Sequence, residues 1–138
     1  MFWRCLFLAL AFLPLLTPEA RAADKAWEDC GQTADQYRKI AGCTAVLARG
    51  AAESETSRVN AYVNRGYAYS KSDYDRAIKD YDEAIRLDPK VARAYNARGR
   101  AYHLKGDNDR AIADFNEAIR LNPRYALAYE GRGKVYHS

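Results

Sequence analysis

A segment of fifteen residues returns almost unchanged 34 residues further along the chain. Residues 75–89 have the sequence DRAIKDYDEAIRLDP and residues 109–123 have DRAIADFNEAIRLNP, with the same residue at 11 of the 15 positions. A second pattern, a tyrosine followed by glycine at i+4 and tyrosine at i+7, starts at Tyr62, Tyr95 and Tyr129. Self-similarity at a fixed period of roughly 20–50 residues indicates a stack of supersecondary units. The chain is therefore expected to repeat one small unit rather than to form a single mixed core.

Each half of the repeated unit has the period of an α-helix. Positions i, i+4 and i+7 share one face of a helix, and the apolar residues at 77, 78, 81, 84 and 85 follow the same period. Asp73 and Asp107 are expected to cap the second helix of each unit, which Pro89 and Pro123 should end. The charged residues of this helix predict three i,i+4 ion pairs: Asp75–Lys79, Arg76–Asp80 and Asp82–Arg86.

These residue types at these offsets resemble the tetratricopeptide repeat. The positions that carry the resemblance are Tyr95, Gly99, Tyr102, Ala111, Phe115, Ala118 and Pro123. The resemblance implies an all-α fold, a right-handed superhelical solenoid of antiparallel helix pairs. It also implies that small residues let the two helices of a pair approach closely. These helix-packing residues are Gly66 with Ala77, Gly99 with Ala111, and Gly133 in the last unit.

The repeat divides the chain into five segments. Residues 1–22 are expected to be a signal peptide, 23–58 a degenerate first helix pair, 59–91 and 92–125 two full repeats, and 126–138 a half-repeat that caps the stack. The 59–91 unit is one residue short of the family pattern and lacks the turn glycine, so a tighter or distorted turn is expected there. In the first unit Trp27, Cys30 and Gly31 fit the start of the family pattern, and Cys43 falls where the small alanine belongs.

The first 22 residues have the layout of a secretory signal. Arg4 precedes twelve apolar residues, 5–16, and a polar stretch ends in a small-x-small motif that predicts cleavage after Ala22. The competing interpretation is a membrane anchor, but twelve helical residues rise only about 18 Å against a hydrocarbon core of about 30 Å. No later segment is apolar enough to span a membrane stably. The chain is similar to small exported repeat proteins of Gram-negative envelopes, so a periplasmic or secreted location is expected.

Two cysteines, Cys30 and Cys43, remain after the predicted cleavage. An even number in an exported chain suggests a disulfide, and the resemblance places both near the point where the two helices of a unit touch. The alternatives are a redox-active pair and half of a metal site. A redox pair normally has two residues between its cysteines, and a structural zinc site needs four ligands, so the structural disulfide is preferred.

The remaining chemistry of the sequence does not indicate catalysis. The two histidines, His103 and His137, occupy equivalent positions of neighbouring units, and no nucleophile or paired carboxylates accompany them. No cofactor and no metal are expected, and the chain is not expected to be an enzyme. Its 22 basic and 18 acidic residues are interspersed, which argues against a nucleic-acid partner. Arg65, Arg98 and Arg132 each precede a repeat glycine and are expected to pack their stems between units and keep their charged ends in water.

The resemblance implies a protein or peptide partner in a concave groove lined by the first helix of each unit. The family's contact positions fall on Asn60, Val63, Tyr67, Ser70 and Lys71, on Arg93, Asn96, Arg100, His103 and Leu104, and on Leu127, Glu130, Lys134 and His137. This lining is basic and rich in amides, which favours an acidic peptide or a free C-terminal carboxylate. The alternative function is a structural envelope protein that forms a homo-oligomer through the incomplete repeat at its C-terminal edge.

Overall fold

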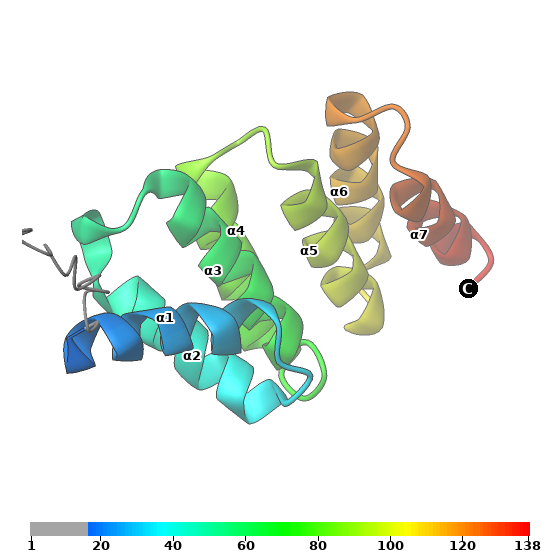
Figure 1. The fold of residues 1–138 in the computed structure, drawn as a ribbon. Helices are drawn as coiled ribbons and strands as arrows, with labels where there is room; N and C mark the ends of the chain where they lie inside the picture. Colours follow the sequence, from blue (N-terminus) through cyan, green and yellow to red (C-terminus); the bar gives the residue numbers. More distant parts are fainter. Residues whose placement is uncertain (1–16) are drawn as a thin grey trace, which may run out of the picture.

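The computed structural model describes residues 17–138, and within that range every regular element is helical. The helices are α1 (Pro18–Gly31), α2 (Gln36–Ala48), α3 (Glu55–Tyr69), α4 (Tyr74–Leu87), α5 (Ala92–Leu104), α6 (Asn108–Leu121) and α7 (Ala126–Tyr136). One turn of 3₁₀ helix, η1 (Gly50–Ala52), joins α2 to α3. The helices form a row with α1 at one end and α7 at the other (Figure 1). The all-α prediction is confirmed.

The helices pack as successive pairs. α1 packs on α2, α3 on α4 and α5 on α6, and each second helix also packs on the first helix of the next unit. α3 contacts α5 and α5 contacts α7, so the first helices share one side of the stack. The core is divided accordingly into three clusters, one around Tyr81, one around Phe115 and one around the two cysteines. Within the described range α7 has helices on one side only.

The ends of the helices follow from local side-chain chemistry. Asp73 accepts a hydrogen bond from the backbone amide of Arg76 at 3.0 Å, and Asp107 accepts one from that of Arg110 at 3.2 Å, so both predicted caps are confirmed. Leu87 and Leu121 end α4 and α6 two residues before a proline, as predicted. The first unit ends earlier than its predicted boundary after residue 58, because Ser54 already caps α3. The boundary at 58/59 therefore lies inside a helix.

The shortened turn of the second unit is not tighter than its counterpart. Four residues, 70–73, separate α3 from α4, whereas three residues, 105–107, separate α5 from α6. Helix α5 continues five residues beyond Gly99 and turns through Gly106 at a φ of 84°, but α3 ends three residues beyond Gly66. The missing residue therefore shortens the part of the helix that follows the repeat glycine, and the turn needs no left-handed residue.

Small residues do bring the paired helices together, with one exception. A Cβ atom added at Gly66 would lie 2.7 Å from the ring of Tyr81, and one at Gly99 would lie 3.1 Å from the carbonyl oxygen of Ala111. Ala77 is fully buried in the same core as Tyr81. The prediction that Gly133 packs in the same way is wrong, since an added Cβ there meets nothing within 4 Å.

The helix contact of α7 is made by Gly131 instead. A Cβ atom added at Gly131 would lie 2.5 Å from the ring of Phe115 in α6. The physical reason is that Gly133 corresponds to a position that packs on the second helix of its own unit, and the described residues include no such helix after α7. α7 therefore packs only through the face that turns toward the preceding unit.

In the first unit a disulfide takes the place of an aromatic side chain. Cys30 and Cys43 are bonded, with their Cα atoms 4.5 Å apart. Cys43 is the eighth residue of α2, as Tyr81 is of α4 and Phe115 is of α6. The repeat pattern placed Cys43 at the position of the small alanine, and this assignment was therefore wrong by one helical turn. The covalent bond fills the position where the other two units bury a ring.

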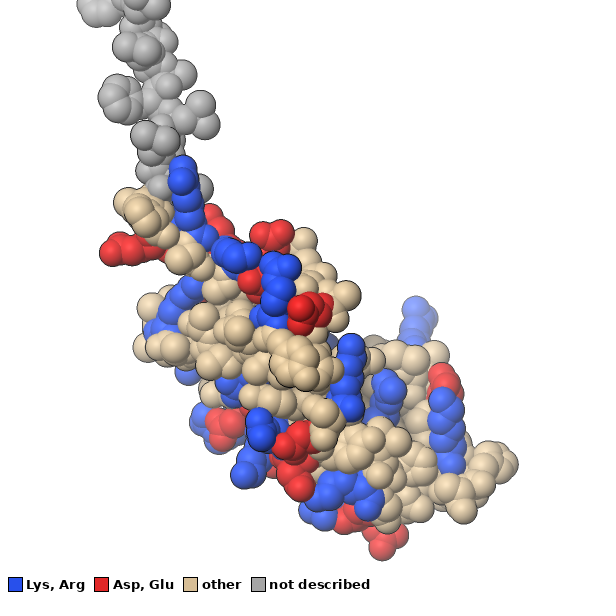
Figure 2. Space-filling model, turned by 90° about the horizontal axis from the view of Figure 1, so that it is seen from below, with Lys and Arg blue, Asp and Glu red and all other residues tan. Residues whose placement is uncertain are grey.

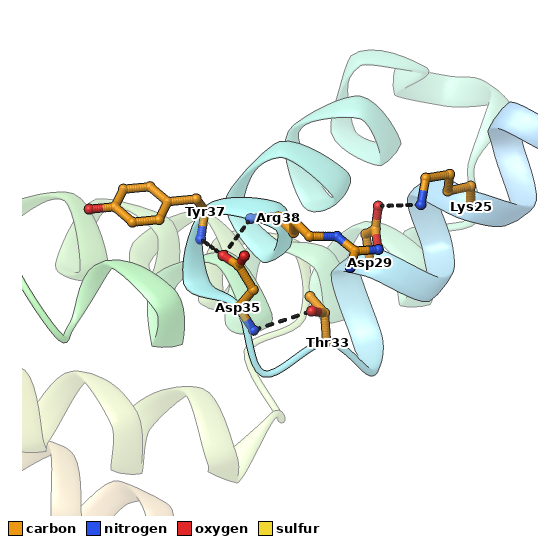
Figure 3. A network of polar contacts seen from close by, with 6 residues as sticks. All are labelled: Lys25, Asp29, Thr33, Asp35, Tyr37 and Arg38. Carbon is orange, nitrogen blue, oxygen red and sulfur yellow. Dashed lines mark hydrogen bonds and ion pairs between the residues drawn. The ribbon is translucent and has the colours of Figure 1, made fainter.

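Near the connection between α1 and α2, polar contacts around the carboxylate of Asp29 link the two helices (Figure 3). Asp29 of α1 pairs with Lys25 at 3.4 Å and with Arg38 of α2 at 2.5 Å. Asp35 caps α2 by accepting the backbone amide of Tyr37 at 2.8 Å. The Tyr37 ring points away from this network and is exposed. These contacts supplement the disulfide in the unit with the smallest apolar core.

Two of the three arginines that precede the repeat glycines, Arg65 and Arg98, do not keep their charged ends in water. Arg65 donates from Nε and Nη2 to both carboxylate oxygens of Asp80, at 2.8 and 2.7 Å, and Arg98 holds Asp114 with the same atoms and distances. Both carboxylates are buried. The expectation of solvated guanidinium groups was wrong for these two residues, because each lies opposite a carboxylate of the paired helix, whereas Arg132 binds only the amide of Asn116 among residues 17–138.

The predicted i,i+4 ion pairs are likewise replaced by other pairings. Asp80 is taken by Arg65, and Asp82 pairs with Arg98 of the next unit at 2.5 Å. Asp75 pairs with Lys105, also of the next unit. The arginines of the predicted pairs instead bind carboxylates three residues earlier in the chain: Arg76 binds Asp73, and Arg86 binds Glu83. Asp75 and Asp82 therefore connect neighbouring units, and Asp80 connects the two helices of its own unit.

The predicted signal peptide lies mostly outside the described residues, since 1–16 are not part of the description. Thr17 caps α1 and Pro18 begins it, so residues 18–22 form its first turn. The first side chains of α1 to be buried are those of Ala26 and Cys30. Within residues 17–138, every helix is too short or too polar to cross a lipid bilayer.

Candidate functional site

The side of the solenoid formed by α3, α5 and α7 is hollowed by three depressions that meet at Arg100. The first lies between α5 and α7 and has a volume of about 400 Å³. The second, of about 260 Å³, lies between α3 and α5, and the third, of about 190 Å³, extends to the residue that precedes α7. Together these three depressions are called the groove below. Its lining includes most of the residues that the repeat positions predicted: Val63, Tyr67, Ser70, Lys71, Arg93, Asn96, Arg100, His103, Leu104, Leu127, Glu130 and Lys134.

Two predicted residues lie outside the depressions. Asn60 instead accepts a hydrogen bond from Arg93, so it positions that guanidinium at the edge of the groove. His137 follows the last residue of α7 and is exposed. His103 does line the first depression, where its Nδ1 lies 2.9 Å from Oδ1 of Asn108. The two histidines thus have different surroundings despite their equivalent positions in the repeat.

The positive charge of the groove is concentrated on α5. Arg93 and Arg100 form no ion pair with any carboxylate of the described range, and both are exposed. Arg100 borders all three depressions. Its Nη1 atom lies 3.5 Å from the hydroxyl oxygen of Tyr67. These two guanidinium groups are available to bind a carboxylate.

Two lysines were also predicted for the groove: Lys71 is exposed at the second depression and forms no ion pair within residues 17–138, whereas Lys134 is already paired. Lys134 donates to Glu130 at 2.6 Å, one turn earlier on α7. This hydrogen bond lowers the pKa of the Glu130 carboxyl. Lys134 therefore contributes less net charge to the groove than the two arginines of α5.

A buried amide lies at the centre of the groove. Asn96 is only 4% exposed, and its Oδ1 atom has no hydrogen-bond partner among the described residues. An unpaired buried acceptor costs about 1–3 kcal/mol, so such atoms are uncommon in folded proteins. Asn96 borders the third depression, but its Oδ1 atom is itself buried, so a ligand N–H group can reach that acceptor only if the Asn96 side chain rotates toward the groove. The sequence placed Asn96 in the groove but gave no sign that its oxygen would lack a partner.

Tyrosine hydroxyls complete the polar lining. Tyr81 borders the second depression and Tyr125 the third, and burial raises the pKa of both side chains. Both therefore remain neutral hydrogen-bonding groups at neutral pH. Tyr125 and Asn64 were missed by the sequence analysis, because Tyr125 lies in the connection before α7 and Asn64 is not one of the family's contact positions. The pattern of the repeat contained no signal for either residue.

Charges elsewhere on the surface are mixed. On the face shown in Figure 2, Lys and Arg side chains lie between Asp and Glu side chains along the whole body. No group of three or more potential metal ligands occurs in the part of the chain that the structure covers. The groove is therefore distinguished by two unpaired arginines beside a buried amide and not by a broad basic surface.

Comparison with known proteins identifies relatives of this arrangement. A family model described as Tetratricopeptide repeat matches residues 67–126 and 105–138, which together cover just over half of the chain. No curated protein sequence was found to match.

Several solved structures share the fold. The second TPR domain of human RPAP3, determined in complex with the HSP70 peptide SGPTIEEVD, has a TM-score of 0.72 and 26% identity, over 84% of this chain and 96% of that one. The Arabidopsis OM64 TPR domain has a TM-score of 0.71 and 21% identity, over 85% and 96% of the two chains. The first TPR of Spaghetti (RPAP3), bound to the HSP90 peptide SRMEEVD, has a TM-score of 0.72 and 19% identity, over 85% and 89%.

Proposed function

The chain belongs to the tetratricopeptide repeat family, and on that premise we propose that its groove binds the acidic C-terminal end of a partner protein. The family's fold is a protein–protein interaction module, and the RPAP3 domain that is 26% identical to this chain holds a peptide ending in Glu-Glu-Val-Asp. The observation that carries the proposal is that two guanidinium groups, those of Arg93 and Arg100, have no carboxylate partner among the described residues. Both groups lie beside Asn96, whose side-chain oxygen also has no hydrogen-bond partner.

The chemistry of the groove matches a peptide end in three respects. Arg100 and Arg93 can donate charge-assisted hydrogen bonds to a terminal carboxylate or an acidic side chain. If its side chain rotates toward the groove, Asn96 can accept a hydrogen bond from the backbone amide of the ligand, which would give its buried oxygen a partner. Leu104 and Leu127 are exposed beside these polar groups and offer apolar contacts to a side chain of the ligand.

The test is selection from a library of random nonapeptides that have free C-termini. Enriched sequences should have C-terminal segments that are rich in Asp and Glu. An enriched peptide synthesised as its C-terminal amide should bind at least tenfold more weakly than the same peptide with a free C-terminal carboxylate. The Arg93→Glu/Arg100→Glu/Lys134→Glu variant should lose binding. Arg120→Glu is the matched control, because Arg120 is an exposed arginine on α6 that borders none of the depressions.

Two outcomes would refute the proposal. Enrichment of neutral or basic sequences would show that the groove does not select negative charge. Equal binding by the triple variant and by Arg120→Glu would show that the ligand lies elsewhere on the molecule.

We also propose that the protein acts outside the cytoplasm, as the signal-like residues 1–22 suggest. Two observations support this location. The Cys30–Cys43 disulfide suits an oxidising compartment, and no side chain of residues 17–22 is buried, so removal of this part of α1 takes no residue from the core. Mass spectrometry of the protein from a cell-envelope fraction should find an N-terminus at Ala23. Recovery of the intact N-terminus from the cytosol would refute the proposed location.

A further inference from the structure

Two of the three depressions of the groove lie at the same place in successive repeats. The fully buried ring of Tyr81 forms the floor of the second depression, and that of Phe115 forms the floor of the first. Each ring belongs to the eighth residue of the second helix of its unit. Arg100 borders the second depression from α5 as Lys134 borders the first from α7, each five residues after the first tyrosine of its repeat. The two depressions can therefore be compared position by position.

The lining of the second depression has two cations and no carboxylate. Lys71 is exposed there, at the position where the next repeat has Leu104, and it forms no ion pair within residues 17–138. Arg100 also lacks a carboxylate partner within that range, and its Nη1 atom lies 3.5 Å from the hydroxyl oxygen of Tyr67. The hydroxyl group of Ser70 belongs to the same lining. Two cations with neighbouring hydroxyl groups suit a carboxylate, because each can donate a hydrogen bond to it.

The first depression is larger and is bordered by exposed leucines. Its volume is about 400 Å³, against about 260 Å³ for the second. Gly131 lies where the second depression has Ala97, and the ring of Phe115 on the floor carries no hydroxyl group. Leu104 is 55% and Leu127 is 53% exposed. A large apolar side chain that covers these leucines removes apolar surface from water, which stabilises the complex.

We infer that the groove selects two features of one chain end. The second depression holds the free C-terminal carboxylate of the ligand, between Lys71 and Arg100. The first depression holds a large apolar side chain of the same ligand, such as that of Leu, Met or Phe. This inference rests on the proposed function and adds to it the sequence and the direction of the bound peptide. The peptide runs from α7 toward α3 and ends there.

The spacing of the helices sets the distance between the two features. α5 contacts both α3 and α7, and the three helices follow one another along the row (Figure 1). Packed helices lie about 8–10 Å apart, and an extended peptide advances about 3.3 Å per residue. One helix spacing therefore corresponds to two or three residues of the ligand. The apolar residue is expected two or three positions before the C-terminal residue.

Charge excludes the opposite placement, with the carboxylate in the first depression and the apolar side chain in the second. Glu130 borders the first depression and already pairs with Lys134 at 2.6 Å, so a ligand carboxylate there would lie beside a second negative charge. An apolar side chain in the second depression would remove water from Lys71 and Arg100 without supplying a counter-charge. Each feature of the ligand therefore has one favourable position.

The test is fluorescence anisotropy with the full chain and nonapeptides that are labelled at the N-terminus. Each peptide consists of Asp, Glu and Ser with a free C-terminus, and a single Leu is placed in turn at each of the five positions before the last residue. Binding should be tightest with Leu two or three positions before the last residue and at least fivefold weaker with Leu five positions before it. The C-terminal amide of the best peptide should bind at least tenfold more weakly. That comparison separates a chain end from an internal acidic segment, which has no terminal carboxylate.

Two variants of the protein assign the features to their depressions. Leu127→Ser should remove the positional preference for Leu and keep the preference for the free acid, because Leu127 borders the first depression and not the second. Lys71→Gln should reduce the ratio of free-acid to amide affinity at least threefold and keep the preference for Leu. Both side chains are exposed, so neither substitution disturbs the core. Lys79→Gln is the matched control for Lys71→Gln, because Lys79 is an exposed lysine of α4 that borders none of the depressions, and it should change neither preference.

Three results would overturn the inference and leave the proposed function standing. The first is an affinity for acidic peptides that does not depend on the position of Leu. The second is a preference for Leu that Leu127→Ser leaves unchanged, and the third is a full preference for the free acid in Lys71→Gln. Equal binding of the free acid and the amide by the wild-type protein would overturn the proposed function as well, because the groove would then not recognise a chain end.

Discussion

Arg98 holds Asp114 by two parallel hydrogen bonds, 2.8 Å from Nε and 2.7 Å from Nη2, across the contact between α5 and α6. The same guanidinium donates from Nη1 to Asp82 of α4, so one side chain joins two units. The pair with Asp114 is buried, whereas Asp82 is 49% exposed. Burial and the two nearby carboxylates have opposing effects, and the net result raises the pKa of Arg98, which remains charged at any accessible pH.

Asp114→Ala should destabilise the protein by about 3 kcal/mol, because it leaves the charge of Arg98 without its buried partner. Asp82→Ala removes the exposed partner of the same guanidinium and should cost less than about 1 kcal/mol. Urea denaturation followed by circular dichroism measures both. Equal losses for the two variants would contradict the assignment of the inter-helix stability to the buried pair.

Gly66→Ala and Gly133→Ala should change stability in opposite directions. The added methyl group at Gly66 would lie 2.7 Å from the ring of Tyr81, which is fully buried and cannot move aside, so a loss of about 1–3 kcal/mol is expected. At Gly133 the methyl group meets nothing within 4 Å, and the higher helix propensity of alanine should stabilise the protein by about 0.5–1 kcal/mol. Thermal melts would disprove the packing scheme if both variants shifted in the same direction.

Reduction of the Cys30–Cys43 bond should lower the free energy of unfolding by about 3 kcal/mol, the value that the chain-entropy model assigns to a loop of this length. The measurement is a urea titration with and without dithiothreitol. The double variant Cys30→Ser/Cys43→Ser is the control and should be insensitive to the reductant. A wild-type protein that is equally stable in both conditions would show that the first unit does not depend on its disulfide.

Asn96→Ala should weaken binding of a groove-selected peptide at least fivefold, because the ligand loses the acceptor that has no partner in the free protein. Asn116→Ala is the matched control, since that amide is exposed on α6 and binds Arg132 outside the groove. Titration calorimetry with the same peptide compares them. If the two variants bind with the same affinity, the unpaired oxygen of Asn96 is not part of the binding site.

Much of the groove could be predicted from the repeat alone, because the offsets that identify the family also state which side chains face the ligand. Arg93, Asn96 and Arg100 were found in this way. Tyr125 was missed because it precedes α7, where periodicity carries no information. The pairing of Lys134 with Glu130 was also missed, since both residues satisfy the groove pattern individually and their contact depends on side-chain conformation.

The ion pairs show the limit of sequence reasoning most clearly. Asp80 has Arg76 four residues before it, yet it binds Arg65 on the neighbouring helix. Local spacing identifies which charges share a helix face, but a long arginine can reach either its own helix or the next one. The choice is made by burial, because a desolvated carboxylate needs two well-directed donors and a fork-shaped guanidinium across the helix contact supplies them.

The sequence by itself determined the helices, their capping residues, their ends before proline and the period at which they stack, because each of these depends on residues close together in the chain. Only the tertiary structure decided which face of each helix found a partner. Gly99 and Gly133 have the same local pattern, yet one packs against α6 and the other faces open space. That difference comes from the presence or absence of a neighbouring helix, and a contact between distant segments is not contained in the local periodicity of either one.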